Sequence, residues 1–149
     1  MAEVWFYHLE RSSLEAVLPG LLEKTREKGW RALIRTPDPA RTAALDEHLW
    51  TWREDSFLAH GRSGDPFPER QPILIGEDGE NRNGAQALFI VEGADLSAAE
   101  TFERCFILFD GRDDQQVQAE RERWRTLKGL GLSLAYWKQD EDGRWSRAA

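Results

Sequence analysis

The segments Ala87-Leu88-Phe89-Ile90-Val91 and Cys105-Phe106-Ile107-Leu108-Phe109 are uninterrupted apolar runs, each about as long as an ordinary β-strand. Runs of this kind are typical of strands that are covered on both faces, and such strands occur mainly in parallel sheets flanked by helices. The two runs therefore predict an α/β sandwich whose sheet is mostly parallel.

Shorter strand patterns lie on both sides of these runs. Further strands are predicted at residues 4–9, 31–35, 72–76 and 132–137, with a weaker candidate at residues 56–60. Residues 61–71 and 77–86 are predicted to be loops and turns. No repeat or internal linker interrupts the pattern, so we expect one domain over residues 1–138. Residues 139–149 are polar and are expected to form a frayed tail with Trp145 exposed.

The first predicted helix follows the first strand. Ser12-Ser13-Leu14-Glu15 matches a capping box, with Ser12 as the cap and Glu15 three residues later. Leucines then recur at helical spacing up to Lys28, and Gly29 is expected to end the helix. Pro19 lies inside this pattern and is expected to kink the helix or delay its start.

Further helices are predicted downstream. Asp38-Pro39 is a strong helix start, because an acidic cap is followed by proline at the first helical position. Residues 113–128 predict a long helix with acids in its first turn and Gly129 after its end, and residues 97–102 predict a short one. The helix that begins at Pro39 is expected to bury Ala40, Ala43, Ala44, Leu45 and Leu49.

The composition indicates a soluble globular protein, since 40% of the 149 residues are hydrophobic and 32% are charged. No stretch is long and apolar enough to span a membrane, and residues 1–5 do not begin a secretory signal. Cys105 is the single cysteine and lies in an apolar run, which excludes an intramolecular disulfide. We therefore expect a cytoplasmic protein.

The charge of the chain limits its partners. The formal net charge is −7 at pH 7. Neutralisation of phosphates supplies most non-specific affinity for nucleic acid, so an acidic surface disfavours direct binding to DNA. If the protein acts on DNA, we expect it to do so through other proteins or through one local basic patch.

The phosphate-binding motifs of α/β enzymes are missing from the sequence. The first predicted strand runs into Glu10-Arg11-Ser12-Ser13, without the glycines that let backbone N–H groups approach a phosphate. Gly129-Leu130-Gly131 follows a helix and precedes a strand, so it indicates a helix end rather than a phosphate cradle. The sequence thus predicts no nucleotide-binding loop and no cofactor, and it contains no G-x-S-x-G nucleophile motif.

Candidate metal ligands are few. His8, His48 and His60 have no paired spacing, so a zinc site would need all three together with a carboxylate from distant segments. The predicted strand-to-helix junction also carries three acids, Asp110, Asp113 and Asp114. They fit either the favourable start of a helix or the metal site of a nucleotide- or metal-dependent hydrolase, and we expect the first.

One face of the long C-terminal helix is a candidate binding surface. On a helical wheel, Arg121, Trp124, Arg125 and Lys128 fall on one arc. Val117 lies within the arc and Leu127 beside it. An apolar stripe edged by cations suits an acidic peptide with a hydrophobic anchor, and it also resembles a groove for single-stranded DNA. In the alternative interpretation, Val117, Trp124 and Leu127 are core residues and the cations pair with Glu120 and Glu122.

A second candidate surface is the aromatic corner formed by Leu49-Trp50-Thr51-Trp52 and Ser56-Phe57-Leu58-Ala59-His60. Aromatic residues are frequent anchors of protein interfaces. A position in the core explains the same residues equally well.

The chain resembles the chi subunit family of bacterial DNA polymerase III, from Phe6-Tyr7 to Trp137-Lys138. The resemblance rests on the order and spacing of five stretches, residues 45–50, 56–60, 109–113, 119–125 and 131–137. It implies a Rossmann-like fold without a nucleotide site. It also implies an accessory subunit with no catalytic activity of its own, belonging to a DNA-directed DNA polymerase assembly.

The family's role implies two protein partners. One is the acidic C-terminal tail of single-stranded-DNA-binding protein, which would be held by Arg121, Trp124, Arg125 and Lys128. The other is the psi subunit of the clamp loader, where the organism has one, which would contact Trp50 and Phe57. No metal, membrane contact or substantial direct DNA binding is implied. Two features depart from the family pattern: a basic residue can occupy the place of Val117, and the segment after Lys138 is longer here.

Overall fold

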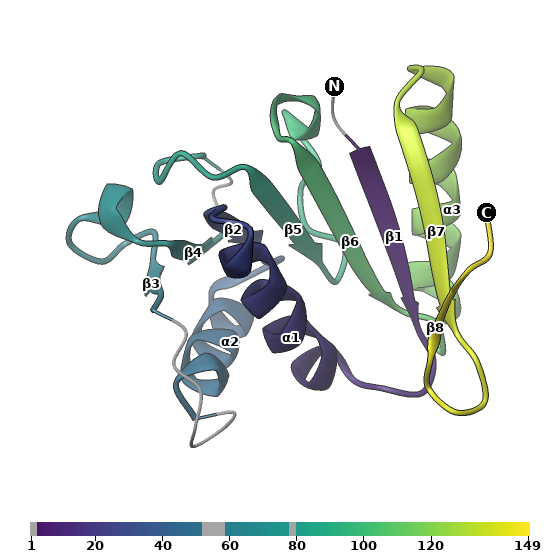
Figure 1. Cartoon of the computed structure of the whole chain (residues 1–149), viewed down its shortest axis with the longest axis horizontal. Helices are drawn as coiled ribbons and strands as arrows, with labels where there is room; N and C mark the ends of the chain where they lie inside the picture. Colours follow the sequence, from purple (N-terminus) through teal and green to yellow (C-terminus); the bar gives the residue numbers. More distant parts are fainter. Residues whose placement is uncertain (1–2, 52–58, 78–79) are drawn as a thin grey trace.

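The computed structural model of the chain describes residues 3–51, 59–77 and 80–149. Its elements in chain order are β1 (Glu3–Leu9), α1 (Leu14–Glu27), β2 (Ala32–Arg35), α2 (Pro39–Thr51), β3 (Gly61–Arg62), η1 (Pro68–Arg70), β4 (Ile73–Gly76), β5 (Ala87–Val91), η2 (Ala99–Thr101), β6 (Arg104–Asp110), α3 (Asp114–Gly129), β7 (Ser133–Gln139) and β8 (Trp145–Arg147). The described strands form one 8-stranded sheet in the order β3-β4-β2-β5-β6-β1-β7-β8 (Figure 1). All of its neighbouring pairs are parallel except β7 and β8, which confirms the predicted fold class.

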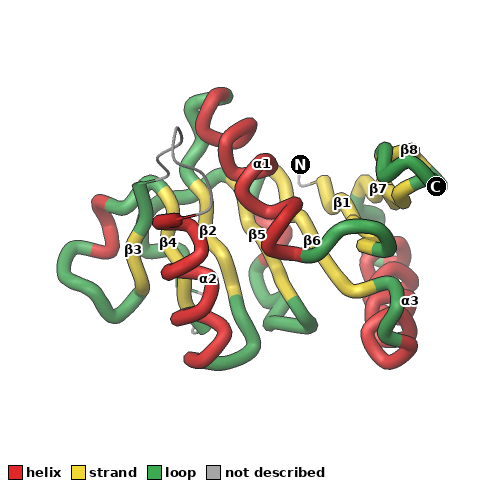
Figure 2. Tube along the Cα trace, turned by 90° about the horizontal axis from the view of Figure 1, so that it is seen from below, coloured by secondary structure: helices red, strands yellow, loops and turns green. Residues whose placement is uncertain are grey.

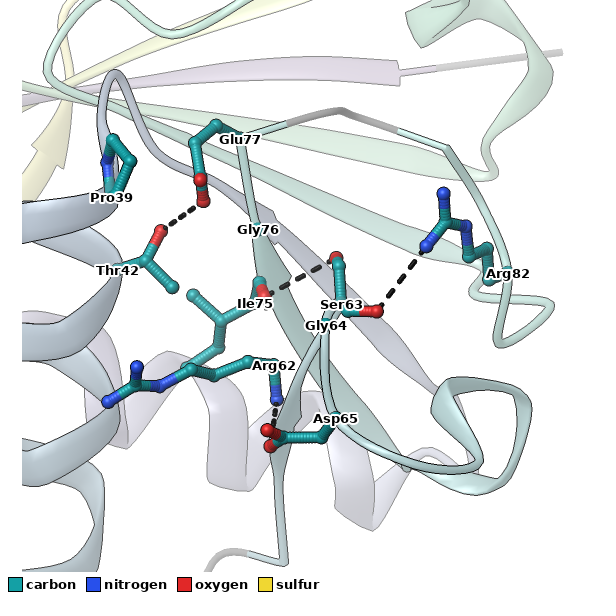
Figure 3. A pocket seen from close by; sticks show the side chains of 10 residues that line it. All are labelled: Pro39, Thr42, Arg62, Ser63, Gly64, Asp65, Ile75, Gly76, Glu77 and Arg82. Atoms are coloured by element: carbon teal, nitrogen blue, oxygen red, sulfur yellow. Dashed lines mark hydrogen bonds between the residues drawn. The ribbon is translucent and has the colours of Figure 1, made fainter.

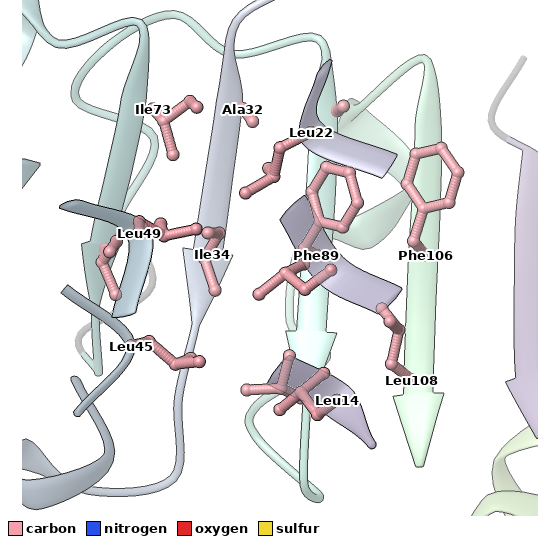
Figure 4. Close-up of a cluster of buried hydrophobic side chains, with 14 of the residues drawn as sticks. Leu14, Leu22, Ala32, Ile34, Leu45, Leu49, Ile73, Phe89, Phe106 and Leu108 are labelled. Atoms are coloured by element: carbon pink, nitrogen blue, oxygen red, sulfur yellow. The ribbon is translucent and has the colours of Figure 1, made fainter. Parts of the chain in front are cut away.

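Helices cover both faces of this sheet, and α1 and α3 lie on opposite sides of it (Figure 2). On the face covered by α1 and α2, Leu22 and Leu45 pack with Ile34 and Phe89 of the central strands (Figure 4). Full burial of a leucine or isoleucine side chain stabilises the fold by about 1.5–3 kcal/mol. On the other face, Val117 and Leu127 anchor α3 in a second cluster of buried residues.

The cap of α1 differs from the prediction by one residue. Ser13 is the cap, and its Oγ accepts a hydrogen bond from the backbone N–H of Ala16 at 3.2 Å. Ser12 instead accepts a hydrogen bond from Gln139 at 3.0 Å. The predicted capping box is therefore wrong, because the two neighbouring serines suit the cap position equally well in sequence and a distant residue decides between them.

Pro19 lies in the interior of α1 without delaying its start at Leu14. A proline has no N–H group, so the carbonyl of Glu15, four residues earlier, loses its helical donor. His48 of α2 takes the place of that donor, because its Nε2 lies 2.7 Å from the Glu15 carbonyl oxygen. A carbonyl can only accept, so Nε2 carries the proton. The bond joins α1 and α2 at the position where Pro19 removes a hydrogen bond from α1.

The second helix begins as predicted, and the Asp38 carboxylate accepts a hydrogen bond from the Arg41 N–H at 2.8 Å. Leu45 and Leu49 enter the core, which confirms part of the predicted inner face. The prediction is wrong for Ala40 and Ala44, which are exposed, and Ala43 is half-buried. Thr42 takes the inward position, one turn before Leu45, where its hydroxyl bonds with Thr36 and Glu77.

Three short segments also differ from their predictions. The expected loop at residues 61–71 contains the two-residue strand β3 and the 3-10 turn η1. The candidate strand at residues 56–60 lies mostly outside the described residues, and residues 59–60 have no strand structure. The expected short helix at residues 97–102 is the single 3-10 turn η2.

The C-terminal part of the chain is more ordered than its polarity predicts. Gly129 is the last residue of α3 rather than the residue after it, and Gly131, with φ of 79°, makes the turn into β7. Residues 145–147 form β8 along the edge of β7, so the expectation of a frayed tail is wrong. Trp145 is half-buried because its ring packs edge-on against Tyr7 at 5.0 Å.

Candidate functional site

A groove of about 370 Å³ is lined by α3, β7 and residues 148–149. The helix α3 and the strand β7 lie side by side in Figure 1. The lining residues of the groove are Arg121, Trp124 and Arg125 of α3, Tyr136 and Lys138 of β7, and Ala148 and Ala149. The structure thus brings together three of the four residues that the helical wheel selected. It adds an aromatic residue and a cation from β7, which a wheel of one helix cannot reveal.

The indole of Trp124 is fixed between two other rings. Its ring centroid lies 5.3 Å from that of Phe6 in the core and 5.7 Å from that of Tyr136, both in edge-to-face geometry. Aromatic pairs in this geometry contribute beyond their buried area. Trp124 is half-buried, so the same side chain contributes to the core and to the wall of the groove.

The side chain of Tyr136 is held in place by His8. Its hydroxyl lies 2.6 Å from Nδ1 of His8, and Nε2 of His8 lies 2.9 Å from a carboxylate oxygen of Glu10. Burial raises the pKa of Tyr136 to about 12, so the ring stays a neutral phenol. Burial also lowers the pKa of His8 from its ordinary value. Gly111 makes room for the imidazole, since a Cβ there would stand 2.0 Å from His8 Cδ2.

The groove is positive although the chain is acidic. Arg121, Arg125 and Lys138 line it, and the described lining residues include no carboxylate side chain. Guanidinium groups suit carboxylates because they can form two parallel hydrogen bonds to one carboxylate. The groove is therefore suited to an anionic ligand that also carries an apolar group for Trp124 and Tyr136.

Other residues of the wheel lie elsewhere. Lys128 is exposed on α3 but does not line the groove. Val117 and Leu127 are buried, as the alternative interpretation of this face expected. Glu120 is also buried and pairs with Arg123 at 3.6 Å, so it is no partner for the exposed cations of the groove. Burial raises the pKa of Glu120 above its ordinary value.

The aromatic corner is described in part. Trp50 is 49% exposed, and its ring lies 4.2 Å from that of His60, centroid to centroid. His60 is held in turn by Asp46, whose carboxylate oxygen is 3.0 Å from Nε2. Trp52 and Phe57 lie outside the described residues.

Comparison with known proteins identifies the family. A family model described as "DNA polymerase III chi subunit, HolC" matches residues 1–135. The chain belongs to this family. It is 30% identical over 97 residues to the probable DNA polymerase III subunit chi of Rickettsia prowazekii (strain Madrid E), which is 65% of this chain and 59% of that protein. It is 26% identical over 132 residues to the DNA polymerase III subunit chi of Escherichia coli (strain K12), covering 85% and 88% of the two chains.

Membership of the chi family places the chain among the proteins of DNA replication. The matched residues include Arg121, Trp124 and Arg125 of the groove, and the match ends at residue 135. Tyr136, Lys138 and residues 148–149 therefore extend the groove beyond the matched part of this chi-family chain.

Two of the three acids that follow β6 have structural partners in this chi-family chain. Asp113 caps α3, accepting hydrogen bonds from the N–H groups of Gln115 and Gln116 at 3.0 and 3.4 Å. Asp110 accepts from the Arg112 backbone at 2.9 Å, which holds the pKa of its carboxyl below the ordinary value. Asp114 is exposed in the first turn of α3. The arrangement is that of a capped helix start.

Nearby, a small pocket of about 220 Å³ lies at the carboxyl ends of β1 and β6. Open α/β sheets often bind ligands at such a point, where successive connections run to opposite faces. Arg41 lines this pocket and pairs with Glu15 and Glu92. The Arg41 guanidinium in this pocket is thus engaged by carboxylates of the protein itself.

A larger, polar pocket of about 450 Å³ lies beside β3, β4 and the start of α2 (Figure 3). Its polar groups bond mainly with one another. Glu77 accepts a hydrogen bond from Thr42 at 2.7 Å, and Asp65 accepts one from the Arg62 backbone at 2.9 Å. Arg82 donates to the Ser63 carbonyl at 3.3 Å. Because these polar groups already have hydrogen-bond partners within the lining, they favour a structural role for the pocket.

The histidines lie in three separate environments, with Tyr136, Glu15 and Asp46 as their respective partners. Over the described parts of the chain, no group of three or more His, Cys, Asp or Glu side chains could hold a metal ion. In the same residues, no helix is long and apolar enough to cross a membrane.

Proposed function

We propose that this chi-family protein is an adaptor that links the clamp-loader complex of DNA polymerase III to single-stranded-DNA-binding protein. It does so by holding the acidic C-terminal tail of that protein in the groove beside α3. The observation that carries the proposal is a groove with three cations and two aromatic rings on a chain of net charge −7.

The groove offers each part of such a tail a complementary group. The guanidinium groups of Arg121 and Arg125 meet its carboxylates, and Lys138 adds a third cation from β7. The tail's terminal phenylalanine lies against Trp124 and Tyr136, where an edge-to-face contact is favoured. Lys128 stands outside the groove and acts at longer range, by steering the acidic tail toward it.

The second partner in the proposal is the psi subunit of the clamp loader, at the corner of Trp50 and Phe57. Trp50 supports this assignment, because it is the kind of half-exposed aromatic residue that anchors interfaces and its ring is fixed by His60. Trp50 belongs to α2, whereas the groove is lined by α3, β7 and residues 148–149. The two helices lie at different parts of the sheet (Figure 1). One chain can therefore hold both partners at once.

We propose further that the chain has no catalytic activity of its own. Two of the three acids that a metal-dependent hydrolase would use are engaged elsewhere, because Asp113 caps α3 and Asp110 bonds to Arg112, and Asp114 is exposed in the first turn of α3. Direct binding of single-stranded DNA is disfavoured by the net charge, and it would show a steep dependence on salt without any protein partner.

The test is the binding of a fluorescent peptide that copies the acidic, phenylalanine-ended tail. Arg121→Ala removes one charge-assisted contact and should weaken binding about ten-fold or more. The matched control is Arg70→Ala, which removes an exposed arginine from η1 at the opposite end of the sheet. If the folded wild-type protein does not bind the peptide, or if both variants bind equally, the proposed function is wrong.

A further inference from the structure

The segment beyond the family match contributes to the groove. Residues 145–147 add β8 to the outer edge of β7, and residues 148–149 continue along that edge. The backbone N–H of Ala148 donates to the Tyr136 carbonyl at 2.7 Å, and the Tyr136 N–H donates to a backbone oxygen of Ala149 at 3.1 Å. The segment therefore covers the edge of β7 at the point where Tyr136 enters the groove.

Several contacts fix this segment in place. The ring of Trp145 packs against Tyr7 on the face of the sheet away from the groove. Arg147 donates from Nε to the same Ala149 oxygen at 2.9 Å. Next to the turn that joins β7 and β8 into a hairpin, Gln139 is buried and its side-chain oxygen accepts from the N–H groups of Arg11 and Ser12 at 3.0 and 3.2 Å. The hairpin is thus tied to the start of α1 and to the core.

The groove remains open with this segment in place. Ala148 and Ala149 line the space of about 370 Å³ together with the residues of α3, so the segment borders the groove and does not fill it. Because Tyr136 already has partners for both of its backbone groups, a bound peptide cannot pair with β7 there as an added strand. It must be held by side-chain contacts between α3 and the segment.

We propose that residues 145–149 form the second wall of the groove and that the small side chain of Ala148 sets its width. The occupant is an acidic peptide whose apolar side chain enters between Trp124 and Ala148, so the wall selects the size of that side chain. This inference rests on the proposed function. Trp145 is a positioning residue in it, because Trp145 fixes the wall from the opposite face.

Two substitutions test the wall with the fluorescent tail peptide. Ala148→Trp fills the groove and should weaken binding about ten-fold or more, whereas Ala119→Trp, an exposed position on the opposite side of α3, should leave it unchanged. Trp145→Ala releases the wall and should weaken binding about five-fold, and Trp145→Phe, which keeps a ring on Tyr7, should restore most of the loss. Thermal melts confirm that each variant is folded.

A second peptide that ends in alanine shows whether position 148 limits the size of the bound side chain or affects binding only through the structure of the protein. Ala148→Trp should reduce the affinity for the phenylalanine-ended peptide and leave the weaker affinity for the alanine-ended peptide almost unchanged. If Arg121→Ala abolishes binding while the folded Ala148→Trp and Trp145→Ala variants bind like wild type, the wall is refuted and the proposed function stands. If wild type does not bind either peptide, both fail.

Discussion

Replacing His48 by alanine should reveal how α1 accommodates a proline in its interior. In the folded chain, Nε2 of His48 donates to the carbonyl of Glu15, the group that Pro19 leaves without a helical donor. His48→Ala leaves that carbonyl without this partner, and a polar group that loses its partner costs about 1–2 kcal/mol. A loss of that size should lower the melting temperature by roughly 2–8 °C in a domain of this length.

The decisive form of the experiment is a double-mutant cycle with Pro19→Ala. Alanine at position 19 supplies the missing N–H, so the carbonyl of Glu15 no longer depends on His48. His48→Ala should then cost about 1 kcal/mol less in the Pro19→Ala background than in wild type. Glu47→Ala, an exposed position on α2, is the control for effects of substitution in that helix.

Urea denaturation at constant pH measures the four unfolding free energies. If the two effects are additive within about 0.3–0.5 kcal/mol, the histidine does not replace the donor that proline lacks and the reasoning is refuted. A stabilising effect of His48→Ala would refute it as well, since it would mean that the bond costs more in burial than it contributes.

Three further outcomes are expected. Gln139→Leu removes the acceptor of backbone N–H groups at the start of α1, and a loss of about 3 kcal/mol should lower the melting temperature by roughly 6–12 °C; an unchanged melt would mean that water replaces the amide. Burial lowers the pKa of His8, so the unfolded chain is protonated first and stability should fall as the pH drops below about 6.5. In urea titrations, His8→Asn should flatten that slope, and an equal slope in both proteins would contradict the assignment. Burial raises the pKa of the Cys105 thiol to about 12, so a thiol reagent should label it only as fast as the chain unfolds, and rapid labelling of native protein would refute its buried position.

The fold was largely predictable because its strands are continuous apolar runs, as at residues 87–91 and 105–109. The details that sequence reasoning missed depend on contacts between distant residues. The choice between Ser12 and Ser13 as the cap of α1 is decided by Gln139, more than a hundred residues away. Polarity alone predicted a frayed tail, because nothing in residues 139–149 reveals that Trp145 finds Tyr7.

Only the part of the candidate site that lies on α3 was predictable, because the rest depends on contacts between distant residues. A helical wheel relates residues of one element, and it selected the three α3 residues that line the groove. Tyr136 and Lys138 alternate with buried or half-buried residues along β7, and only the packing of α3 against that strand brings them to the groove. The wheel also included Lys128, because it could not show that the groove beside β7 and residues 148–149 does not extend to that residue.

The two roles of Trp124 determine which substitution best tests the groove. α3 is a polar helix with few buried apolar residues, and Trp124 is one of the side chains that attach it to the core through Phe6. Truncating Trp124 would therefore loosen α3 as well as remove a wall, so a loss of binding would have two explanations. Arg121 and Arg125 are exposed, and their truncation removes charge from the groove without opening the core. For this reason a loss of peptide binding in Arg121→Ala, with an unchanged melt, can be assigned to the groove itself.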